Sequence, residues 1–242
     1  MRAYAKITTS VTDGVLTITL NVPERRNAIG PQMTNELLWA LHDARAASDV
    51  RVVVITGAGK AFCAGGDFQQ MSGGADAEAL PPKGDYADLL LLLARFDKPV
   101  IAKVNGHAMG GGLGLVAAAT FAVASSDAQL GTPEIQVGLF PMMIMAVLQR
   151  IVPRRRLLEM MLFGERLDAD QAAAAGIINR AAEVQGHGAS YAPKRRWPYI
   201  GVWHNGGWAA TSADLALPPP IASAGCSGPD RVFFDAGSRM IM

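Results

Sequence analysis

Two glycine-rich segments of this chain could supply backbone amides that bind an anion. They are GKAFCAGGD, residues 59–67, and NGHAMGGGLG, residues 105–114, and each follows an apolar run typical of a buried strand. Glycine lets the backbone approach a ligand closely, and amides at a helix N-terminus carry partial positive charge. Two such turns facing each other would form an oxyanion hole, although each could also be only a tight connection between a strand and a helix.

Other chemistries built on glycine loops or nucleophiles lack their motifs. No G-x-G-x-x-G occurs in residues 105–114, and neither G-x-x-x-x-G-K-[ST] nor G-x-S-x-G occurs anywhere in the chain. These absences argue against dinucleotide, nucleoside-triphosphate and serine-hydrolase sites. We also expect no metal site, because the histidines have no metal-ligand spacing, and we interpret His107 as a turn or core residue.

An alternation of strands and helices must position these segments, which predicts an α/β fold. Residues 5–11 and 15–20 flank Asp13-Gly14, a hairpin turn pair, and Pro31 suits the first position of a helix. Further helices are expected from Asp85 and from about Pro141. Apolar runs predict buried strands in three places: RVVVITGAG (51–59), the segment from Pro99 to Asn105, and residues 121–124. Strands that alternate with helices in this way indicate a largely parallel sheet.

Composition and charge limit the possible partners. The chain has 242 residues, half of them apolar, with 22 basic and 21 acidic side chains, so we expect no nucleic-acid partner. Residues 104–126 carry no formal charge, but a turn followed by a buried helix explains their glycines better than a membrane span. The two cysteines form no motif and the N-terminus lacks a signal-peptide pattern, which indicates a cytoplasmic protein.

Several long motifs, in order and spacing, resemble the crotonase (enoyl-CoA hydratase/isomerase) superfamily over about residues 7–180. They are PERRNAIG (23–30), VVVITGAGKAFCAGGD (52–67), KPVIAKVNGHAMGGGLGL (98–115), LGTPEIQVGLFP (130–141) and LFGERLDADQAAAAGIINR (162–180). The resemblance implies a spiral of ββα units finished by a C-terminal helical region, and assembly as a homo-trimer or hexamer. It also implies an acyl-CoA thioester as substrate, with no cofactor other than that substrate's own coenzyme A.

The same resemblance assigns roles to individual glycines. It places the two oxyanion-hole amides at Gly66 and Gly111, aimed at a thioester oxygen that becomes an enolate. The neighbouring residues that it implies for substrate binding are Ala28, Ala64, Gly65, Asp67 and Gly110. Asp67 could instead only fix its turn.

The carboxylates are the point where this sequence departs from the family. Hydratases of the family carry two glutamates, one of which matches Glu134, whereas Gly114 stands at the position of the other. Hydration by the two-carboxylate route needs both groups, but one base suffices to move a double bond. A glycine inside a helix costs about 1 kcal/mol relative to alanine, so Gly114 reflects either close packing or room for substrate.

These observations predict a crotonase-type enzyme that isomerises or hydrates an enoyl-CoA, with Glu134 as acid/base. For Glu134 the simpler interpretation is an exposed charge at a helix start. We expect isomerase activity to exceed hydratase activity, and Gly114→Glu to move the balance towards hydration. Two alternatives stay open: another acyl-CoA reaction on the same scaffold, such as hydrolysis or decarboxylation, and a non-catalytic or damaged acyl-CoA binder.

The C-terminal part of the chain has a different composition. We predict a catalytic core over residues 1–182 and an atypical tail over residues 183–242, rich in Pro, Gly, Ser and Trp and without helical periodicity. The expected C-terminal helices are therefore atypical or lost, and we interpret the tail as disordered or as the product of a reading-frame shift.

Overall fold

The computed structural model describes residues 2–67, 80–182, 201–204, 207–210, 233–234 and 240–241. The chain divides into two compact units, residues 1–190 and 191–242. In the second unit, β11 (Gly201–His204) pairs antiparallel with β12 (Gly207–Ala210), and β13 (Phe233–Phe234) with β14 (Met240–Ile241). Apart from these strands, the tail prediction lies outside the described residues and stays a prediction.

A six-stranded sheet forms the base of the first unit, and its strand order is β1-β2-β3-β5-β7-β10. The strands are β1 (Ile7–Thr12), β2 (Val15–Leu20), β3 (Val52–Gly57), β5 (Val100–Val104), β7 (Phe121–Ser125) and β10 (Arg180–Ala182). The β1–β2 hairpin turns at Asp13 and Gly14, which have φ of 51° and 78°, as a two-residue hairpin turn requires. Every other pairing in this sheet is parallel, so the predicted α/β class and largely parallel sheet are confirmed.

A second sheet has four short strands. Two of them belong to the glycine-rich segments, and the other two come later in the chain. Its strands, in sheet order, are β4 (Ala61–Cys63), β6 (His107–Met109), β8 (Gln129–Gly131) and β9 (Arg166–Asp168). The first three run parallel and β9 is antiparallel to β8. His107 accepts a hydrogen bond at Nδ1 from the Gln129 amide, 3.0 Å away, and so joins two of these strands, as a turn histidine would.

The two sheets and the helices repeat as ββα units. Each unit has a strand in the large sheet, then a three-residue strand in the small sheet, then a helix: β3-β4-α3, β5-β6-α4 and β7-β8-α5. The helices are α1 (Pro31–Ala46), α3 (Tyr86–Ala94), α4 (Gly111–Ala118), α5 (Met142–Leu148), α6 (Arg154–Phe163) and α7 (Ala169–Ala174), with the 3-10 helices η1 (Pro23–Arg25) and η2 (Pro133–Val137). This repetition is the expected spiral.

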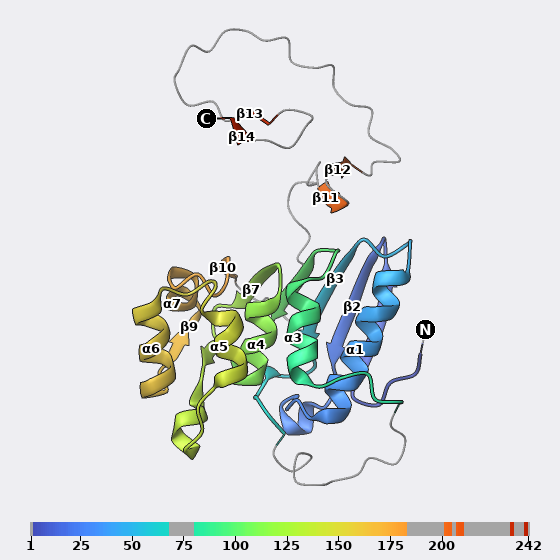
Figure 1. Cartoon of the computed structure of the whole chain (residues 1–242). Helices are drawn as coiled ribbons and strands as arrows, with labels where there is room; N and C mark the ends of the chain where they lie inside the picture. Colours follow the sequence, from blue (N-terminus) through green and yellow to red (C-terminus); the bar gives the residue numbers. More distant parts are fainter. Residues whose placement is uncertain are drawn as a thin grey trace. The chain divides into compact units, whose positions relative to one another are not determined.

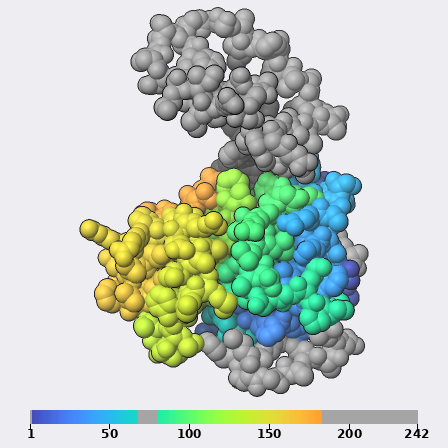
Figure 2. Space-filling view, viewed as in Figure 1, coloured from blue at the N-terminus to red at the C-terminus, as the bar shows by residue number. Residues whose placement is uncertain are grey.

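Helices α1, α3 and α4 lie side by side along one face of the large sheet. Figure 1 shows α1, α3 and α4 in a row in front of it, and in Figure 2 the same face runs from α1 in blue to α6 in yellow. Helix α4 is buried from Gly112 to Ala118, which explains its lack of any polar side chain. None of the helices in the described ranges is long and apolar enough to cross a membrane.

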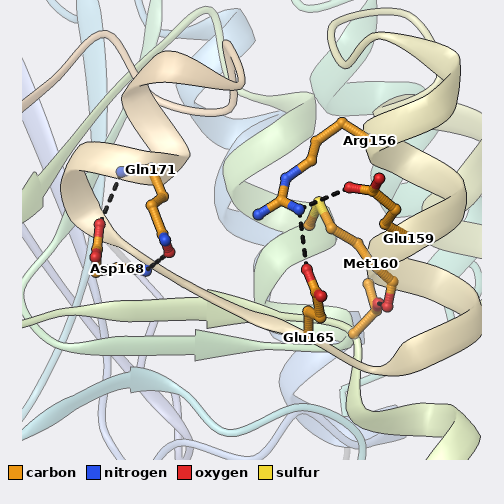
Figure 3. Close-up of polar contacts among 7 residues, drawn as sticks. Arg156, Glu159, Met160, Glu165, Asp168 and Gln171 are labelled. Atoms are coloured by element: carbon orange, nitrogen blue, oxygen red, sulfur yellow. Dashed lines mark hydrogen bonds and ion pairs between the residues drawn. The ribbon is translucent and has the colours of Figure 1, made fainter.

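Surface ion pairs and a helix cap connect the residues of α6, β9 and α7. Arg156 binds Glu159 and Glu165 at 2.8 and 2.9 Å, and Asp168 caps α7 through the Gln171 amide at 2.7 Å (Figure 3). These ion pairs are exposed, so we expect each to contribute little to stability. Helix α6 begins at Arg154, and Arg154 and Arg155 are exposed to solvent.

Candidate active site

The small sheet brings three loops of the chain to one place. Strands β4, β6 and β8 are parallel, so their carboxyl ends lie at the same edge, and the chain continues from them into residues 64–67, 110–111 and 132–134. Ligands of parallel α/β sheets bind at such an edge. The two glycine-rich turns and the segment that carries Glu134 are therefore neighbours because of this sheet.

Gly110 is the point at which the three loops meet. A Cβ atom placed on it would lie 2.7 Å from Oε1 of Glu134 and 3.6 Å from the Cα atom of Gly65. Its backbone has φ 50° and ψ −120°, a conformation outside the regions open to other residues. Glycine at position 110 thus permits both the turn into α4 and the close approach of the carboxylate.

The amides of Gly66 and Gly111 have no hydrogen-bond acceptor among the residues that the structure describes. Gly66 forms a parallel bridge with Ile29, in which the bonds are made by the flanking Gly65 carbonyl at 2.8 Å and Asp67 amide at 2.9 Å. The N–H of Gly66 therefore points to the other side. Gly111 is the first residue of α4, where an N–H has no partner within the helix. Within the described ranges neither amide donates a hydrogen bond to the protein.

Glu134 brings a partly buried carboxylate next to Gly110. Its Oε2 atom is buried and has no hydrogen-bond partner among the described residues. Burial raises the pKa of Glu134 above its ordinary value of 4.5, an effect opposed by a backbone hydrogen bond. A buried oxygen without a partner and a raised carboxyl pKa are both features of proton-transferring groups, and they argue against a simple exposed charge.

Two further glycines of α4 reflect close packing rather than a need for flexibility. A Cβ atom on Gly112 would lie 2.6 Å from the carbonyl oxygen of Cys63 in β4. A Cβ atom on Gly114 would overlap with the Tyr86 hydroxyl and would lie 2.6 Å from Cγ2 of Ile144. Of the two explanations that the sequence left open for Gly114, close packing is the one that holds. No sequence signal connects Tyr86 or Ile144 to this position, because the contacts join three separate helices.

The residues expected to bind the substrate, apart from Gly110, lie around the Ile29–Gly66 bridge. Ala28 is half-buried, Ala64 is exposed and Gly65 is buried. Asp67 is 5% exposed and forms an ion pair of 2.7 Å with Arg25. This ion pair fixes the end of the Gly65–Asp67 turn, the alternative role considered for Asp67, and substrate binding by these residues stays a prediction.

Comparison with known proteins shows which protein family the chain matches. Residues 10–188 match the family described as Enoyl-CoA hydratase/isomerase. The chain is 36% identical over 184 residues to the "Probable enoyl-CoA hydratase EchA14" of Mycobacterium tuberculosis. The aligned region covers 76% of this chain and 72% of that protein. It is 34% identical over 181 residues to the (E)-benzylidenesuccinyl-CoA hydratase of Thauera aromatica, covering 73% and 70%. A solved enoyl-CoA hydratase structure from Mycobacterium smegmatis superposes with a TM-score of 0.66 at 35% identity, over 74% of this chain and 70% of that one.

Proposed function

Because this chain belongs to the enoyl-CoA hydratase/isomerase family, we propose that it isomerises an enoyl-CoA by moving the double bond from C3 to C2. Membership makes it a crotonase-type acyl-CoA enzyme. The choice of reaction rests on one observation, that the site has a single carboxylate. Glu134 lies at the junction of the loops, whereas position 114 has no room for a side chain. One carboxylate is what isomerisation needs.

The proposed reaction requires no external reactant. The Glu134 carboxylate removes a proton from C2 of the 3-enoyl thioester, and the electron pair moves into the thioester carbonyl. The resulting enolate oxygen is held by the amides of Gly66 and Gly111, where preorganised donors stabilise developing charge. The enolate then collapses as Glu134 returns a proton to C4, which leaves the double bond between C2 and C3.

Hydration of a trans-2-enoyl-CoA is the second candidate. The relatives reported above are named as hydratases, which favours it. On this chain the reaction would need a group other than residue 114 to help Glu134 hold the attacking water.

Steady-state kinetics of the full chain distinguish the two reactions. We expect kcat/KM for isomerisation of a cis-3-enoyl-CoA to exceed kcat/KM for hydration of the trans-2-enoyl-CoA of the same length. The reason is that only the second reaction must activate water. A hydration rate far above the isomerisation rate would contradict the proposal, and CoA binding without turnover of either substrate would indicate a non-catalytic binder.

The pH dependence of isomerisation should report the buried carboxyl. Glu134 must be ionised to accept the C2 proton, and burial raises its pKa above 4.5. Activity should therefore be full above the raised pKa and fall as the pH drops through it, so that the acid limb of kcat/KM lies above about 4.5. A profile of kcat/KM against pH measures this directly. A profile that stays flat down to pH of about 4.5 would show that another group is the base.

A further inference from the structure

Tyr86 is in direct contact with the first turn of α4. Its hydroxyl donates a hydrogen bond to the carbonyl oxygen of Gly111, the residue whose amide is proposed to hold the enolate. The same hydroxyl occupies the space into which a side chain at position 114 would project. One atom of Tyr86 thus touches both the proposed anion-binding turn and the position at which the family's other glutamate is missing.

The start of α3 fixes where this side chain is held. Asp85 caps α3 by accepting hydrogen bonds from the amides of Ala87 and Asp88, at 2.8 and 3.0 Å. The Asp88 carboxylate in turn accepts from the Asp85 amide at 3.0 Å, which completes a capping box. Tyr86 is the first residue of the helix, so its backbone is fixed by the cap and its hydroxyl by Gly111.

Burial favours the protonated, hydrogen-bond-donating form of the Tyr86 hydroxyl. Burial raises the pKa of its hydroxyl well above 10, and the nearby Cys63 and Glu134 would raise it further when charged. A hydroxyl that stays protonated cannot act as a general base. Its single proton is donated to the Gly111 carbonyl, so its action on the reaction is exerted through the groups that it holds or excludes.

We propose that Tyr86 is a positioning residue that sets the reaction type of this site. Its hydroxyl aligns the Gly111 turn, and by filling the space beside Gly114 it leaves no room for a second carboxylate from α4. Residues that bind charge in a transition state depend on such supporting contacts to stay within a fraction of an ångström of the productive geometry. This inference rests on the proposed function, since both concern the enolate held at Gly111.

The proposal changes the expectation for Gly114→Glu. The first atom of the new side chain would already overlap with Tyr86 and lie 2.6 Å from Ile144, so the carboxylate has no path into the site. We therefore expect the single substitution to impair packing and turnover rather than to create a hydratase. Tyr86→Phe removes the overlapping oxygen, and the nearest remaining ring atom, Cζ, would be 3.4 Å from the new Cβ.

The test uses Tyr86→Phe in the full chain, with Tyr4→Phe as the matched control. Tyr4 is also half-buried against the core, but its charged neighbours are Asp43, Arg2 and Glu36, none of which belongs to the candidate site. We expect Tyr86→Phe to lower kcat for a cis-3-enoyl-CoA by about 10- to 100-fold with KM changed little, because the Gly111 turn is misplaced while the loop of residues 64–67 is unchanged. Tyr4→Phe should behave as the wild type. A kcat for Tyr86→Phe within about twofold of the wild type would overturn the proposal.

A binding measurement separates this inference from the proposed function. A 3-ketoacyl-CoA absorbs in the near ultraviolet only as its enolate, so its bound spectrum reports the Gly111 turn without any turnover. We expect Tyr86→Phe to bind this probe with a smaller enolate fraction than the wild type. An equal fraction would overturn the role of Tyr86 even if the wild type isomerises its substrate. If the wild type turns over no enoyl-CoA, the proposed function fails while the enolate fraction still decides the role of Tyr86.

A double-mutant cycle tests the packing part of the proposal. Gly114→Ala should reduce kcat more in the wild type than in the Tyr86→Phe background, since only the first contains the overlapping hydroxyl. The contact of the new methyl group with Ile144 is present in both backgrounds, so its effect on kcat cancels when the two backgrounds are compared. Equal effects in the two backgrounds would show that Tyr86 does not limit what position 114 can hold.

Discussion

Glu134→Gln is expected to lower kcat for isomerisation of a cis-3-enoyl-CoA by about 10²- to 10⁴-fold, the usual contribution of a positioned acid/base. Glutamine keeps the shape of the side chain beside Gly110 but cannot accept the C2 proton. The binding loops are untouched, so the dissociation constant of a saturated acyl-CoA, measured by calorimetry, should change by no more than about threefold.

The matched control for this substitution is Glu159→Gln. Glu159 is 47% exposed on α6 and its partner is Arg156 (Figure 3), so its loss removes a surface ion pair only. Turnover and stability should both stay close to those of the wild type. Wild-type turnover in Glu134→Gln would exclude Glu134 as the base, and equal losses in the two variants would point to a general effect of lost charge.

Gly110→Ala is expected to have the next largest effect, because it disturbs all three loops at once. The added Cβ atom would lie 2.7 Å from Oε1 of Glu134, and the backbone at φ 50° and ψ −120° does not suit alanine. Displacement of the carboxylate and of the adjacent Gly111 amide should reduce kcat by at least about 10²-fold. Backbone strain should lower the free energy of unfolding by roughly 1–3 kcal/mol, as measured by denaturant titration.

Gly138→Ala is the control that separates the effect of backbone strain from the effect of displacing the Glu134 carboxylate. Gly138 follows η2 with φ 73° and ψ 18°, and a Cβ atom on it would meet nothing within 4 Å. This variant should lose about 1–2 kcal/mol of stability and keep its turnover. If Gly110→Ala were as active as Gly138→Ala, the close approach of Glu134 to the glycine turn would not matter for catalysis.

The elements that carry long apolar patterns could be predicted from the sequence. The β1–β2 hairpin, α1, β3 and β5 lie where the turn residues, the proline and the apolar runs indicated. The strands β4, β6, β8 and β9 were missed, because three residues are too few to show an alternating pattern. Yet these strands are what bring the glycine turns and Glu134 together.

The candidate site could also be predicted only in part from the sequence. The motif resemblance gave Gly66, Gly111 and Glu134, and the three loops that carry these residues do lie together. The reason for Gly114 was not readable from sequence, since it depends on how α3 and α5 pack on α4. Contacts between separate helices leave no local spacing pattern, so Tyr86 could be found only in the structure.

The most direct test of the account is chromatographic separation of the cis-3- and trans-2-enoyl-CoA isomers after reaction in ¹⁸O-labelled water, followed by mass spectrometry of each product, with the wild type and Glu134→Gln. Isomerisation through an enolate adds no atom to the substrate. We predict that the wild type forms trans-2-enoyl-CoA of unchanged mass as its main product, and that Glu134→Gln forms almost none in the same time. A labelled 3-hydroxyacyl-CoA as the main product, or equal conversion by the two proteins, would contradict the account.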